Sequence, residues 1–290
     1  MDRNLTIILP SYRSKKLILS HLKFLSKNYK IIVIENSYDT SLEKIIKSKY
    51  KNVEVYLKKN IGYGRAVNFA ARKVKTKFFF VMNPDAKIYK NTLKNLIKYT
   101  KKLKNFGAIG PIYENQKNKF RRKLVKVNKL VSAAMLINTK TFLKIKGYDE
   151  NFFLYYEDDD FFLKFKSNNL KLFLVTESFI KHKKTKTVRK TLNLHSTTFS
   201  NFKERNSTFL VGGWHGQWSK FYFFKKNYGY IEALRKCLPK NLVNLIQILI
   251  FIFFDPAKAR YKYFKLEGFL CSLFGLPAFK RSVYDKENFY

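Results

Sequence analysis

The chain has 290 residues, and its 46% hydrophobic content is enough to bury a sizeable core in one large domain, or in one domain with a smaller appendage. This composition excludes a disordered chain. Lysine and arginine outnumber the acids 59 to 20, so the net charge of +39 predicts attraction to polyanions such as nucleic acid, an anionic membrane face or a nucleoside diphosphate.

The two cysteines, Cys237 and Cys271, are too few for a disulfide framework and lack the spacing of a zinc site. They favour a reducing compartment. The N-terminal region lacks the long apolar core of a signal peptide, because its apolar run, Leu5–Leu9, is short and contains Thr6. We therefore expect a cytoplasmic protein.

Short apolar segments alternate with segments of helical period over the first hundred residues. We expect strands at Leu5–Leu9, Ile31–Ile34, Val53–Leu57 and Phe78–Met82, and helices at Lys15–Leu25, Leu42–Tyr50, Gly62–Val74 and Thr92–Leu103. This alternation predicts an α/β fold with a mostly parallel sheet flanked by helices. In such folds the ligand lies beyond the carboxyl ends of the strands.

Polar residues follow each of these four strands. They are Pro10, Ser11 and Tyr12 after the first strand, Glu35, Asn36 and Ser37 after the second, Asn60, Gly62, Gly64 and Arg65 after the third, and Asn83 and Asp85 after the fourth. Because the carboxyl ends of parallel strands meet at one edge, one ligand can contact all four groups. The GYG sequence alone is also typical of a simple turn into a helix. We expect Asn68 to support this turn rather than to bind.

Four consecutive acids, residues 157–160, stand inside the aromatic run FFLYYEDDDFF. Adjacent carboxylates among aromatic rings repel one another and lose solvation, so a purely structural role requires compensating cations or hydrogen bonds. The structural alternative is an acidic loop between two half-buried strands. We interpret the segment as the source of a catalytic base.

Recognisable motifs end at about residue 188. Residues 188–290 combine aromatic and basic residues with an apolar stretch, Leu242–Phe254, that is shorter than the roughly 20 residues needed to span a bilayer. We expect a buried or interfacial helix there, in a helical appendage that follows a first domain over residues 1–187. Either this appendage lies on an anionic membrane, or its helices pack on the first domain or on a second subunit.

In order and spacing, these motifs resemble those of the family 2 glycosyltransferases, which are inverting enzymes of the Rossmann-like GT-A fold, and especially their rhamnosyltransferase-like branch. The resemblance extends from Leu5 to His182. It is carried by LPSY, VIENS, NIGYGRAVN, VMNPDA, VSAAMLI, GYDENFFLYYEDDDFFLK and a histidine after the following strand. It implies a GT-A catalytic domain over residues 1–187 and a hexosyltransferase, such as a rhamnosyltransferase, of cell-envelope polysaccharide biosynthesis.

The chain departs from the family pattern at two positions. Glu35 occupies a place where the family more often has Asp, and Asn83-Pro84-Asp85 keeps only the second acid of the DxD motif. A carboxylate at Glu35 accepts the N3–H of uracil or thymine, whereas cytosine presents an acceptor there, so a UDP- or dTDP-sugar is favoured. The alternative for Glu35 is a solvated acid at a strand end.

The third polar group suits the rest of a nucleotide. We expect Arg65 and the amides near Gly62 and Gly64 to approach the base, ribose or diphosphate, because open glycines leave room and a helix N-terminus favours anions.

Departure of a nucleoside diphosphate develops negative charge, which a divalent cation held by oxygen ligands stabilises. Asp85 is the predicted ligand, assisted by Asn83 directly or through water. The resemblance implies His182 as a nitrogen ligand. Mg²⁺ and Mn²⁺ both suit this set, and an imidazole ligand favours Mn²⁺. The alternatives are a turn acid after proline for Asp85, and a polar residue of the basic run KHKKTK for His182.

Inversion in one displacement needs a base that takes the acceptor's hydroxyl proton as its oxygen attacks the anomeric carbon. The resemblance assigns this role to Asp158, the Asp of the family's ED pair. We expect Glu157 to orient the acceptor or Asp158. Asp160 is expected to contact a cation or the backbone, and Asp159 to contact solvent or a lysine.

The sequence therefore predicts metal-assisted transfer of a sugar from a UDP- or dTDP-sugar to a hydroxyl of a glycan or polyprenyl-linked glycan acceptor. We expect a cytoplasmic enzyme, as a monomer or an oligomer, that is bound peripherally to the anionic inner face of the plasma membrane.

A non-catalytic basic binder of nucleic acid or of a membrane surface is the alternative from another class. Aromatic and basic residues interleave here as they do on single-strand binding surfaces. No nucleic-acid-binding motif is recognisable, however, and the acidic cluster repels phosphate, so we expect no nucleic-acid partner. A nucleotidyltransferase needs a glycine-rich loop after the first strand, and LPSYRSKK has no glycine.

Overall fold

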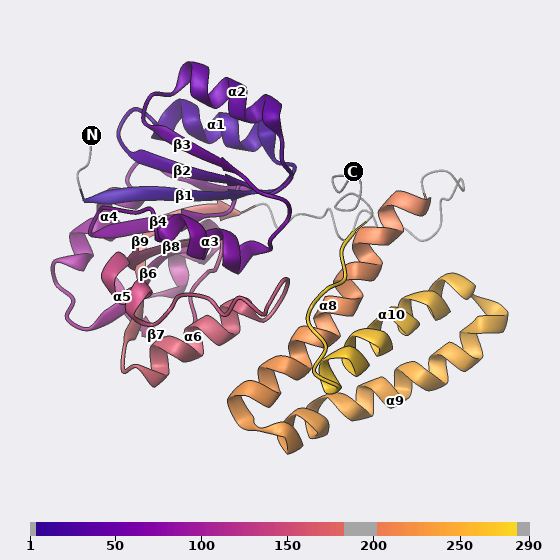
Figure 1. Ribbon diagram of the computed structural model, residues 1–290. Helices are drawn as coiled ribbons and strands as arrows, with labels where there is room; N and C mark the ends of the chain where they lie inside the picture. The colour runs from indigo at the N-terminus through magenta and orange to yellow at the C-terminus, as the bar shows by residue number, and fades with distance from the viewer. Residues whose placement is uncertain (1–3, 183–201, 283–290) are drawn as a thin grey trace. The chain divides into compact units, whose positions relative to one another are not determined.

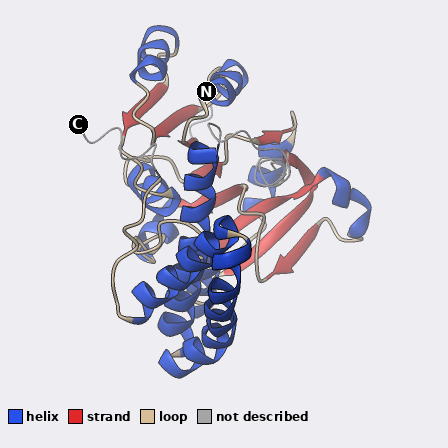
Figure 2. Ribbon diagram, turned by 90° about the vertical axis from the view of Figure 1, so that its right-hand side faces the viewer, coloured by secondary structure: helices blue, strands red, loops and turns tan. Residues whose placement is uncertain are grey.

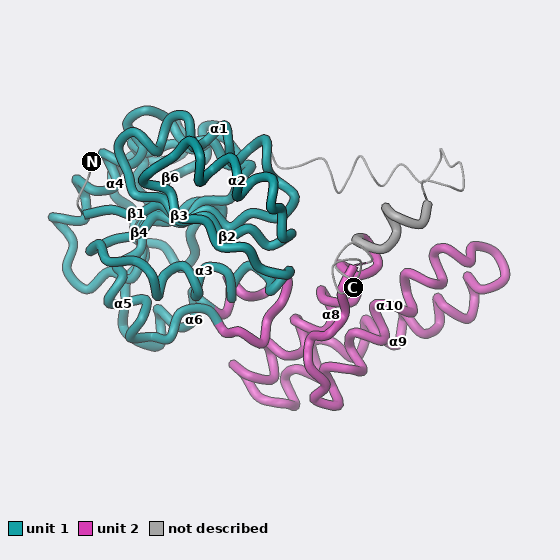
Figure 3. The backbone as a smooth tube through the Cα atoms, turned by 45° about the horizontal axis from the view of Figure 1, so that its top comes forward, with its two compact units in different colours: residues 1–148, 161–184 teal, residues 149–160, 185–290 magenta. Residues whose placement is uncertain are grey.

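The computed structural model describes residues 4–182 and 202–282, with the backbone alone over residues 202–208. The chain divides into two compact units (Figure 3). The first comprises residues 1–148 and 161–184, and the second comprises residues 149–160 and 185–290. The domain boundary predicted between residues 187 and 188 lies outside the described residues and stays a prediction.

Parallel strands form the N-terminal half of the sheet in the first unit. They are β1 (Leu5–Ser11), β2 (Lys30–Glu35), β3 (Val53–Leu57) and β4 (Phe78–Met82), in the order β3-β2-β1-β4 (Figure 1). Helices α1 (Lys15–Leu25), α2 (Thr40–Lys49) and α3 (Tyr63–Ala71) connect them. Every residue of β1 and β4 is buried, as is usual for parallel strands covered on both faces. The predicted alternation is confirmed, with β3 and β4 at their predicted bounds.

The remaining strands make the sheet as a whole mixed. They are β5 (Ala86–Ile88), β6 (Phe106–Tyr113), β7 (Leu124–Val127), β8 (Ala134–Asn138) and β9 (Lys171–His182), and the order continues β4-β8-β6-β9-β5, with β7 also paired to β9. Between them come α4 (Thr92–Thr100), the 3₁₀ helix η1 (Glu114–Lys119), α5 (Thr139–Lys144) and α6 (Glu157–Ser167). β8 runs antiparallel to both β4 and β6, so the predicted parallel arrangement describes the N-terminal half of the sheet.

Alternate side chains of the strands enter two separate cores, one on each face of the sheet. Leu5 and Ile7 of β1 pack in the core that includes Leu22 of α1, whereas Ile8 packs in the core that includes Val67 of α3 and Phe161 of α6. This alternation has the period of two that is expected of a strand. Helices therefore cover both faces of the twisted sheet (Figure 2).

The pairing of β9 with β6 is interrupted. Pro111 of β6 pairs with Val175 of β9, but the next residue of β6, Ile112, pairs with Phe179. Residues 176–178 therefore form a bulge that has no counterpart in β6. Helix α4 holds this bulge, because the carbonyl oxygen of Glu177 accepts a hydrogen bond of 2.7 Å from a side-chain amide of α4. Beyond the bulge, β9 also pairs with β5.

The described part of the second unit is mostly helical. It contains α8 (Phe202–Tyr228), α9 (Tyr230–Phe254) and α10 (Pro256–Leu273), which pack on one another. One small core lies around Phe221 and Phe269, and another around Trp214 and Trp218. Helices α8 and α10 approach closely at Gly268, where a Cβ would overlap the carbonyl oxygen of Trp214.

Helices α9 and α10 form an antiparallel hairpin. The turn between them is a single residue, Asp255, whose carboxylate caps α10 by accepting from the amide of Lys258 at 3.0 Å. Pro256 occupies the first position of α10, where its missing N–H costs no helical hydrogen bond.

Within the described residues, α9 is the helix long and apolar enough, by length and composition, to cross a membrane. The stretch predicted at Leu242–Phe254 is the C-terminal half of this 25-residue helix. Only 17% of its most apolar segment is buried. The predicted buried setting is therefore wrong for most of this segment, and the interfacial setting stays a prediction.

Candidate active site

The carboxyl ends of β1 and β2 lie side by side at one edge of the sheet. Ser11 pairs with Glu35 in the parallel register, and the amide of Asn36 donates to the carbonyl oxygen of Ser11 at 2.8 Å. β3 ends beside β2, where the amide of Lys58 donates to the carbonyl oxygen of Glu35 at 2.8 Å. The first two predicted polar groups are therefore in contact.

The carboxylate of Glu35 organises this edge. Only 1% of the residue is exposed, so the alternative of a solvated strand-end acid is wrong. Its Oε2 accepts from the hydroxyl of Ser11 at 2.5 Å, and its Oε1 accepts from both the amide (2.7 Å) and the hydroxyl of Ser37. A carboxylate oxygen can accept two hydrogen bonds, and within the described residues Oε2 accepts the one from Ser11, so it can accept another.

The turn before α3 joins the third predicted group to this edge. Gly62 has a φ of +86°, a conformation that favours glycine. Its amide donates to Oδ1 of Asn60 at 3.2 Å, and its carbonyl oxygen accepts a weak hydrogen bond of 3.5 Å from the side chain of Asn36. Arg65 is exposed in the first turn of α3.

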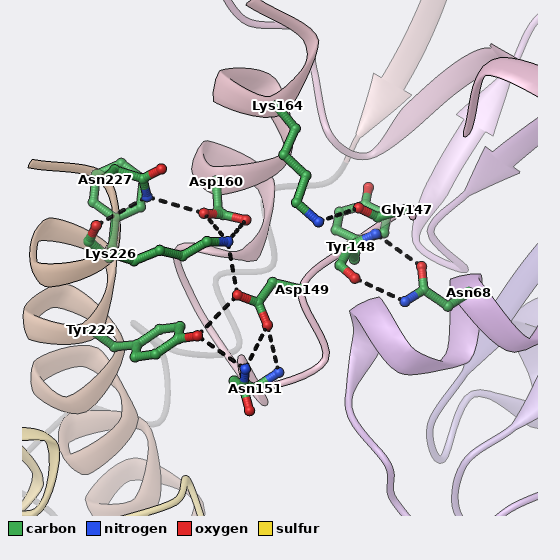
Figure 4. A network of polar contacts seen from close by, with 11 residues as sticks. Asn68, Gly147, Tyr148, Asp149, Asn151, Asp160, Lys164, Tyr222, Lys226 and Asn227 are labelled. Carbon is green, nitrogen blue, oxygen red and sulfur yellow. Dashed lines mark hydrogen bonds and ion pairs between the residues drawn. The ribbon is translucent and has the colours of Figure 1, made fainter. Parts of the chain in front are cut away.

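Gly64 differs from its prediction. A Cβ at this position would lie 3.0 Å from Cβ of Tyr148, so the room predicted for a ligand is filled by that side chain. Asn68, one turn further along α3, holds the same loop: it exchanges two hydrogen bonds of 2.9 Å with the backbone of Tyr148 (Figure 4). Asn68 is structural, as predicted, but it supports the loop at Tyr148 rather than the glycine turn.

Asp85 and His182 come together because β5 pairs antiparallel with the end of β9. Ala86 lies opposite His182 in the register, and Nε2 of His182 is 3.1 Å from Oδ1 of Asp85. Both side chains are partly exposed, at 17% for His182 and 25% for Asp85. Asp85 and His182, 97 positions apart, thus form a polar corner near the ends of β4 and β9.

Two buried polar atoms of the predicted metal ligands have no hydrogen-bond partner among the residues that the structure describes. They are Nδ1 of His182 and the side-chain oxygen of Asn83. The ring of Tyr113 lies 6.2 Å from that of His182, and burial, together with the charge of Asp85, raises the pKa of Tyr113. Unpaired buried polar atoms are rare and indicate a ligand or water.

Asn83, Asp85 and His182 fit a divalent cation chemically. A carboxylate oxygen, an amide oxygen and an imidazole nitrogen are suitable ligands, and a cation bound by few protein groups keeps positions for water or a diphosphate. Within residues 4–182 and 202–282, no group of three or more His, Cys, Asp or Glu side chains could hold a metal ion by itself. A cation in this corner would therefore depend on the amide and on a bound ligand.

His21, which no motif indicated, supports the same loop from α1. Its Nε2 lies 2.8 Å from the carbonyl oxygen of Pro84. Burial is the main reason why the pKa of His21 is below its ordinary value, so a neutral imidazole that donates to Pro84 is favoured. This contact fixes the turn between Asn83 and Asp85.

The predicted acids at 157–160 belong to the second unit and begin α6. The two residues before them, Tyr155 and Tyr156, both have positive φ, of +68° and +64°. Consecutive non-glycine residues in this conformation are strained, and such strain is concentrated at functional sites. Glu157 and Asp160 are buried, whereas Asp158 and Asp159 are half-buried.

Glu157 is held as a neutral acid at neutral pH. Burial, followed by the negative charge of Asp158, raises the pKa of Glu157 to about 8. Its Oε2 has no hydrogen-bond partner in the part of the chain that the structure describes. A protonated carboxyl group accepts protons poorly, so Asp158 is the better candidate for a base in this pair.

Lys226 of α8 binds two acids of residues 149–160, which belong to the second unit. Its Nζ lies 2.7 Å from both carboxylate oxygens of Asp160 and 2.8 Å from Oδ2 of Asp149 (Figure 4). Tyr222 donates to Asp149 at 3.1 Å, and Asn227 donates to Asp160 at 3.0 Å. Although burial opposes it, Lys226 holds the pKa of Asp149 below its ordinary value. The predicted cation contact of Asp160 is therefore present.

No sequence motif indicated that Lys226 makes these contacts. Lys226 is 66 residues from Asp160 and stands in an ordinary Lys-Lys pair, so no sequence pattern distinguished it.

A family model described as "Glycosyl transferase family 2" matches residues 6–173, which is more than half of the chain. None of the curated proteins compared with the chain matches it.

Two solved structures are similar in fold. The mannosyltransferase PcManGT from Pyrobaculum calidifontis, in complex with GDP-Man and Mn²⁺, has a TM-score of 0.53 and 12% identity over 93% of this chain and 87% of that one. GalNAc-T7 with UDP, GalNAc and Mn²⁺ has a TM-score of 0.52 and 14% identity. That match covers 62% of this chain and 43% of GalNAc-T7. These likenesses show a GT-A-like fold.

Proposed function

Because the chain belongs to glycosyl transferase family 2, we propose that it transfers a sugar, with inversion, from a UDP- or dTDP-sugar to a hydroxyl of a glycan or lipid-linked glycan. The observation that carries this proposal is the 3.1 Å contact of His182 with Asp85, two residues after Asn83, whose buried side-chain oxygen has no partner among the described residues. The sequence motifs favour transfer of a hexose such as rhamnose during the synthesis of a cell-envelope polysaccharide.

Asp85, His182 and Asn83 are the residues that would hold a divalent cation. Such a cation, Mn²⁺ or Mg²⁺, would neutralise the charge that develops on the departing diphosphate. The two similar solved structures contain Mn²⁺, and the imidazole of His182 favours the same ion. His21 would keep the loop in place through its contact with Pro84.

The nucleotide base is assigned to the edge formed by β1 and β2. The remaining acceptor position on Oε2 of Glu35 suits the N3–H of uracil or thymine, while the hydroxyls of Ser11 and Ser37 keep the carboxylate oriented. Pro10, near the end of β1, and Tyr12, directly after it, are the other proposed donor-binding residues at this edge. The amides at the start of α3 and the exposed Arg65 suit the negatively charged part of the donor.

Asp158 is the proposed general base. It takes the proton of the acceptor hydroxyl as that oxygen attacks the anomeric carbon, and the nucleoside diphosphate leaves from the opposite side. Glu157 does not compete for this proton at neutral pH, because with a pKa of about 8 only about a tenth of it is ionised at pH 7. Glu157 instead donates a hydrogen bond to the acceptor or to Asp158.

A donor screen tests the proposal. Purified protein with Mn²⁺ is incubated with dTDP-rhamnose, UDP-hexoses and GDP-mannose, and the release of nucleoside diphosphate is measured with and without glycan acceptors. We expect release from a UDP- or dTDP-sugar that increases with acceptor. Absence of both binding and release for every donor would overturn the proposal and favour a non-catalytic basic binder.

A further inference from the structure

The distal part of the α9–α10 hairpin exposes a dense set of large apolar side chains. Over residues 245–254, called the hairpin tip from here on, the exposed fractions are 44% for Leu245, 57% for Ile246, 63% for Leu249, 50% for Ile250, 56% for Ile252 and 82% for both Phe253 and Phe254. Figure 1 shows α9 and α10 as two helices that run side by side.

These side chains surround most of the helix. At about 100° per residue, the exposed positions cover an arc of about 200°, whereas a surface helix of a globular protein buries a stripe of roughly 100°. The polar residue of the tip, Gln247, lies outside this arc with Ile248 and Phe251, which are half-buried. A flat protein partner covers one side of a helix, but lipid chains can surround an arc this wide.

The N-terminal half of α9 is fixed to α8, which limits how much of the helix is available. Asn241 is buried and donates to Oε1 of Gln217 at 3.2 Å, and Asn244 is buried and donates to Asn241 at 3.1 Å. The tip beyond Asn244 has ten residues, or about 15 Å of helix, which is half of the roughly 30 Å hydrocarbon core. The tip alone is therefore too short to span the bilayer.

Basic residues of α10 lie alongside the tip, where Nζ of Lys258 is 5.6 Å from the centre of the Phe251 ring. Residues 256–266 of α10 contain Lys258, Arg260, Lys262 and Lys265, between Asp255, which pairs with Lys258 at 3.0 Å, and Glu267. Lys240, just before the apolar half of α9, is close enough to affect this group, because burial and then the charges of Lys262 and Lys240 lower the pKa of Lys265. Clustered like charges of this kind are stabilised by an anionic surface.

We propose that the hairpin lies along the surface of an anionic bilayer, with the apolar arc of its tip in the outer part of one leaflet and the bases of α10 beside it at the phosphate headgroups. The apolar arc supplies the insertion and the bases supply the preference for anionic lipid. The tip contains none of the residues assigned to donor, metal or acceptor, so this inference is independent of the proposed activity.

Vesicle flotation of the full chain tests the inference. The protein is mixed with phosphatidylcholine vesicles that contain no anionic lipid or about 30% phosphatidylglycerol, at about 0.1 M and about 0.5 M salt. We expect flotation only with the anionic vesicles, reduced but not abolished at high salt. Absence of flotation with anionic vesicles at low salt overturns the inference.

Because the whole chain carries a charge of +39, the apolar variant is decisive. The double variant Phe253→Ser/Phe254→Ser should lower the partition coefficient at least tenfold, whereas Phe24→Ser, which alters a 73% exposed phenylalanine of α1, should leave it unchanged. Equal flotation of the double variant and the wild type would show that general charge attraction alone is responsible and would overturn insertion.

Two further measurements distinguish lipid chains from a second copy of the chain as the partner of this face. A tryptophan introduced as Phe253→Trp should be quenched by brominated lipid chains, and one introduced as Phe24→Trp should not. Size-exclusion chromatography without vesicles should give the same oligomeric state for wild type and Phe253→Ser/Phe254→Ser. A wild-type dimer that this substitution dissociates would identify the face as a contact between two copies of the chain.

Discussion

Lys226 and Asp160 form a charge pair in which one ammonium group lies 2.7 Å from both oxygens of a carboxylate that is 1% exposed. The same ammonium also binds Asp149, so two acids of residues 149–160 share one cation. This segment carries Asp158, the proposed general base, and its neighbour Glu157. The position of the candidate base in the second unit therefore depends on a lysine of α8, which lies beyond the residues matched by the family model.

Lys226→Met should destabilise the protein by about 3 kcal/mol, because removing one partner of a desolvated pair leaves an uncompensated buried carboxylate. This value is at the low end for such pairs, since 29% of the Lys226 side chain is exposed. Urea denaturation measures the loss. Lys226→Arg should recover more than half of it, and Lys225→Met, at the exposed neighbour, should change little. Equal midpoints for Lys226→Met and Lys225→Met would show that the pair contributes nothing.

Asp158→Asn should lower turnover at least a hundredfold while the donor dissociation constant stays within about twofold, because a single displacement depends on one base. Steady-state kinetics and calorimetry with the nucleotide measure the two quantities. Asp159→Asn is the matched control at the adjacent, equally half-buried position and should retain most of the turnover. Unchanged turnover in Asp158→Asn would remove this residue from the mechanism.

Glu157 should make stability depend on pH in the direction opposite to that of a salt-bridged acid. The unfolded chain releases this proton near its ordinary pKa of 4.5, whereas the folded protein holds it until about pH 8. The folded state therefore binds more protons between these values, and the stabilisation present below pH 4.5 is lost as pH rises towards 8.

Glu157→Gln should remove this loss. The variant should gain stability relative to the wild type between about pH 5 and about pH 8.5, on the order of a few kcal/mol. Urea midpoints at the two pH values provide the measurement. A constant difference between variant and wild type across this range would mean that Glu157 ionises normally in the folded protein.

Asp85→Ala and His182→Ala should each weaken Mn²⁺-dependent binding of the nucleoside diphosphate by at least tenfold, because each removes one ligand of a site with few protein ligands. Calorimetry with and without Mn²⁺ tests this expectation. Glu43→Gln, at an exposed ion pair of α2, is a control that should bind as the wild type does. Equal affinity with and without Mn²⁺ in the wild type would exclude a metal role for this corner.

The N-terminal half of the fold was predictable because its signals are local. The apolar run Phe78–Met82 and the alternation around Val53–Leu57 each specify a strand without reference to the rest of the chain, and parallel pairing then places the polar residues that follow at one edge. Strands β5 to β8 were not predicted, and β9 was implied only by the resemblance, as the strand before His182. Their pairings join residues far apart in sequence, and residues 104–129 carry no motif.

Candidate site residues could be selected from the sequence, but their contacts could not. Glu35 was identified from its place after a strand, yet its burial against Ser11 and Ser37 depends on how two strand ends meet. Gly64 looked open in sequence, although Tyr148, 84 positions later, fills the space beside it. Such contacts arise from tertiary packing, which residue type and spacing do not encode.

The bulge at residues 176–178 divides β9 into two parts that pair with different strands. Leu172–Val175, before the bulge, is fixed by β6 and β7, and the end of the strand, from Ile180 to His182, is fixed by β5. Because side chains of a strand alternate between faces, a one-residue deletion in the bulge that moves the end of β9 by one position along β5 would turn His182 away from Asp85 while the pairings of the first half persist. The chain can therefore gain or lose its candidate cation corner through a change in loop length, with every candidate ligand residue still present.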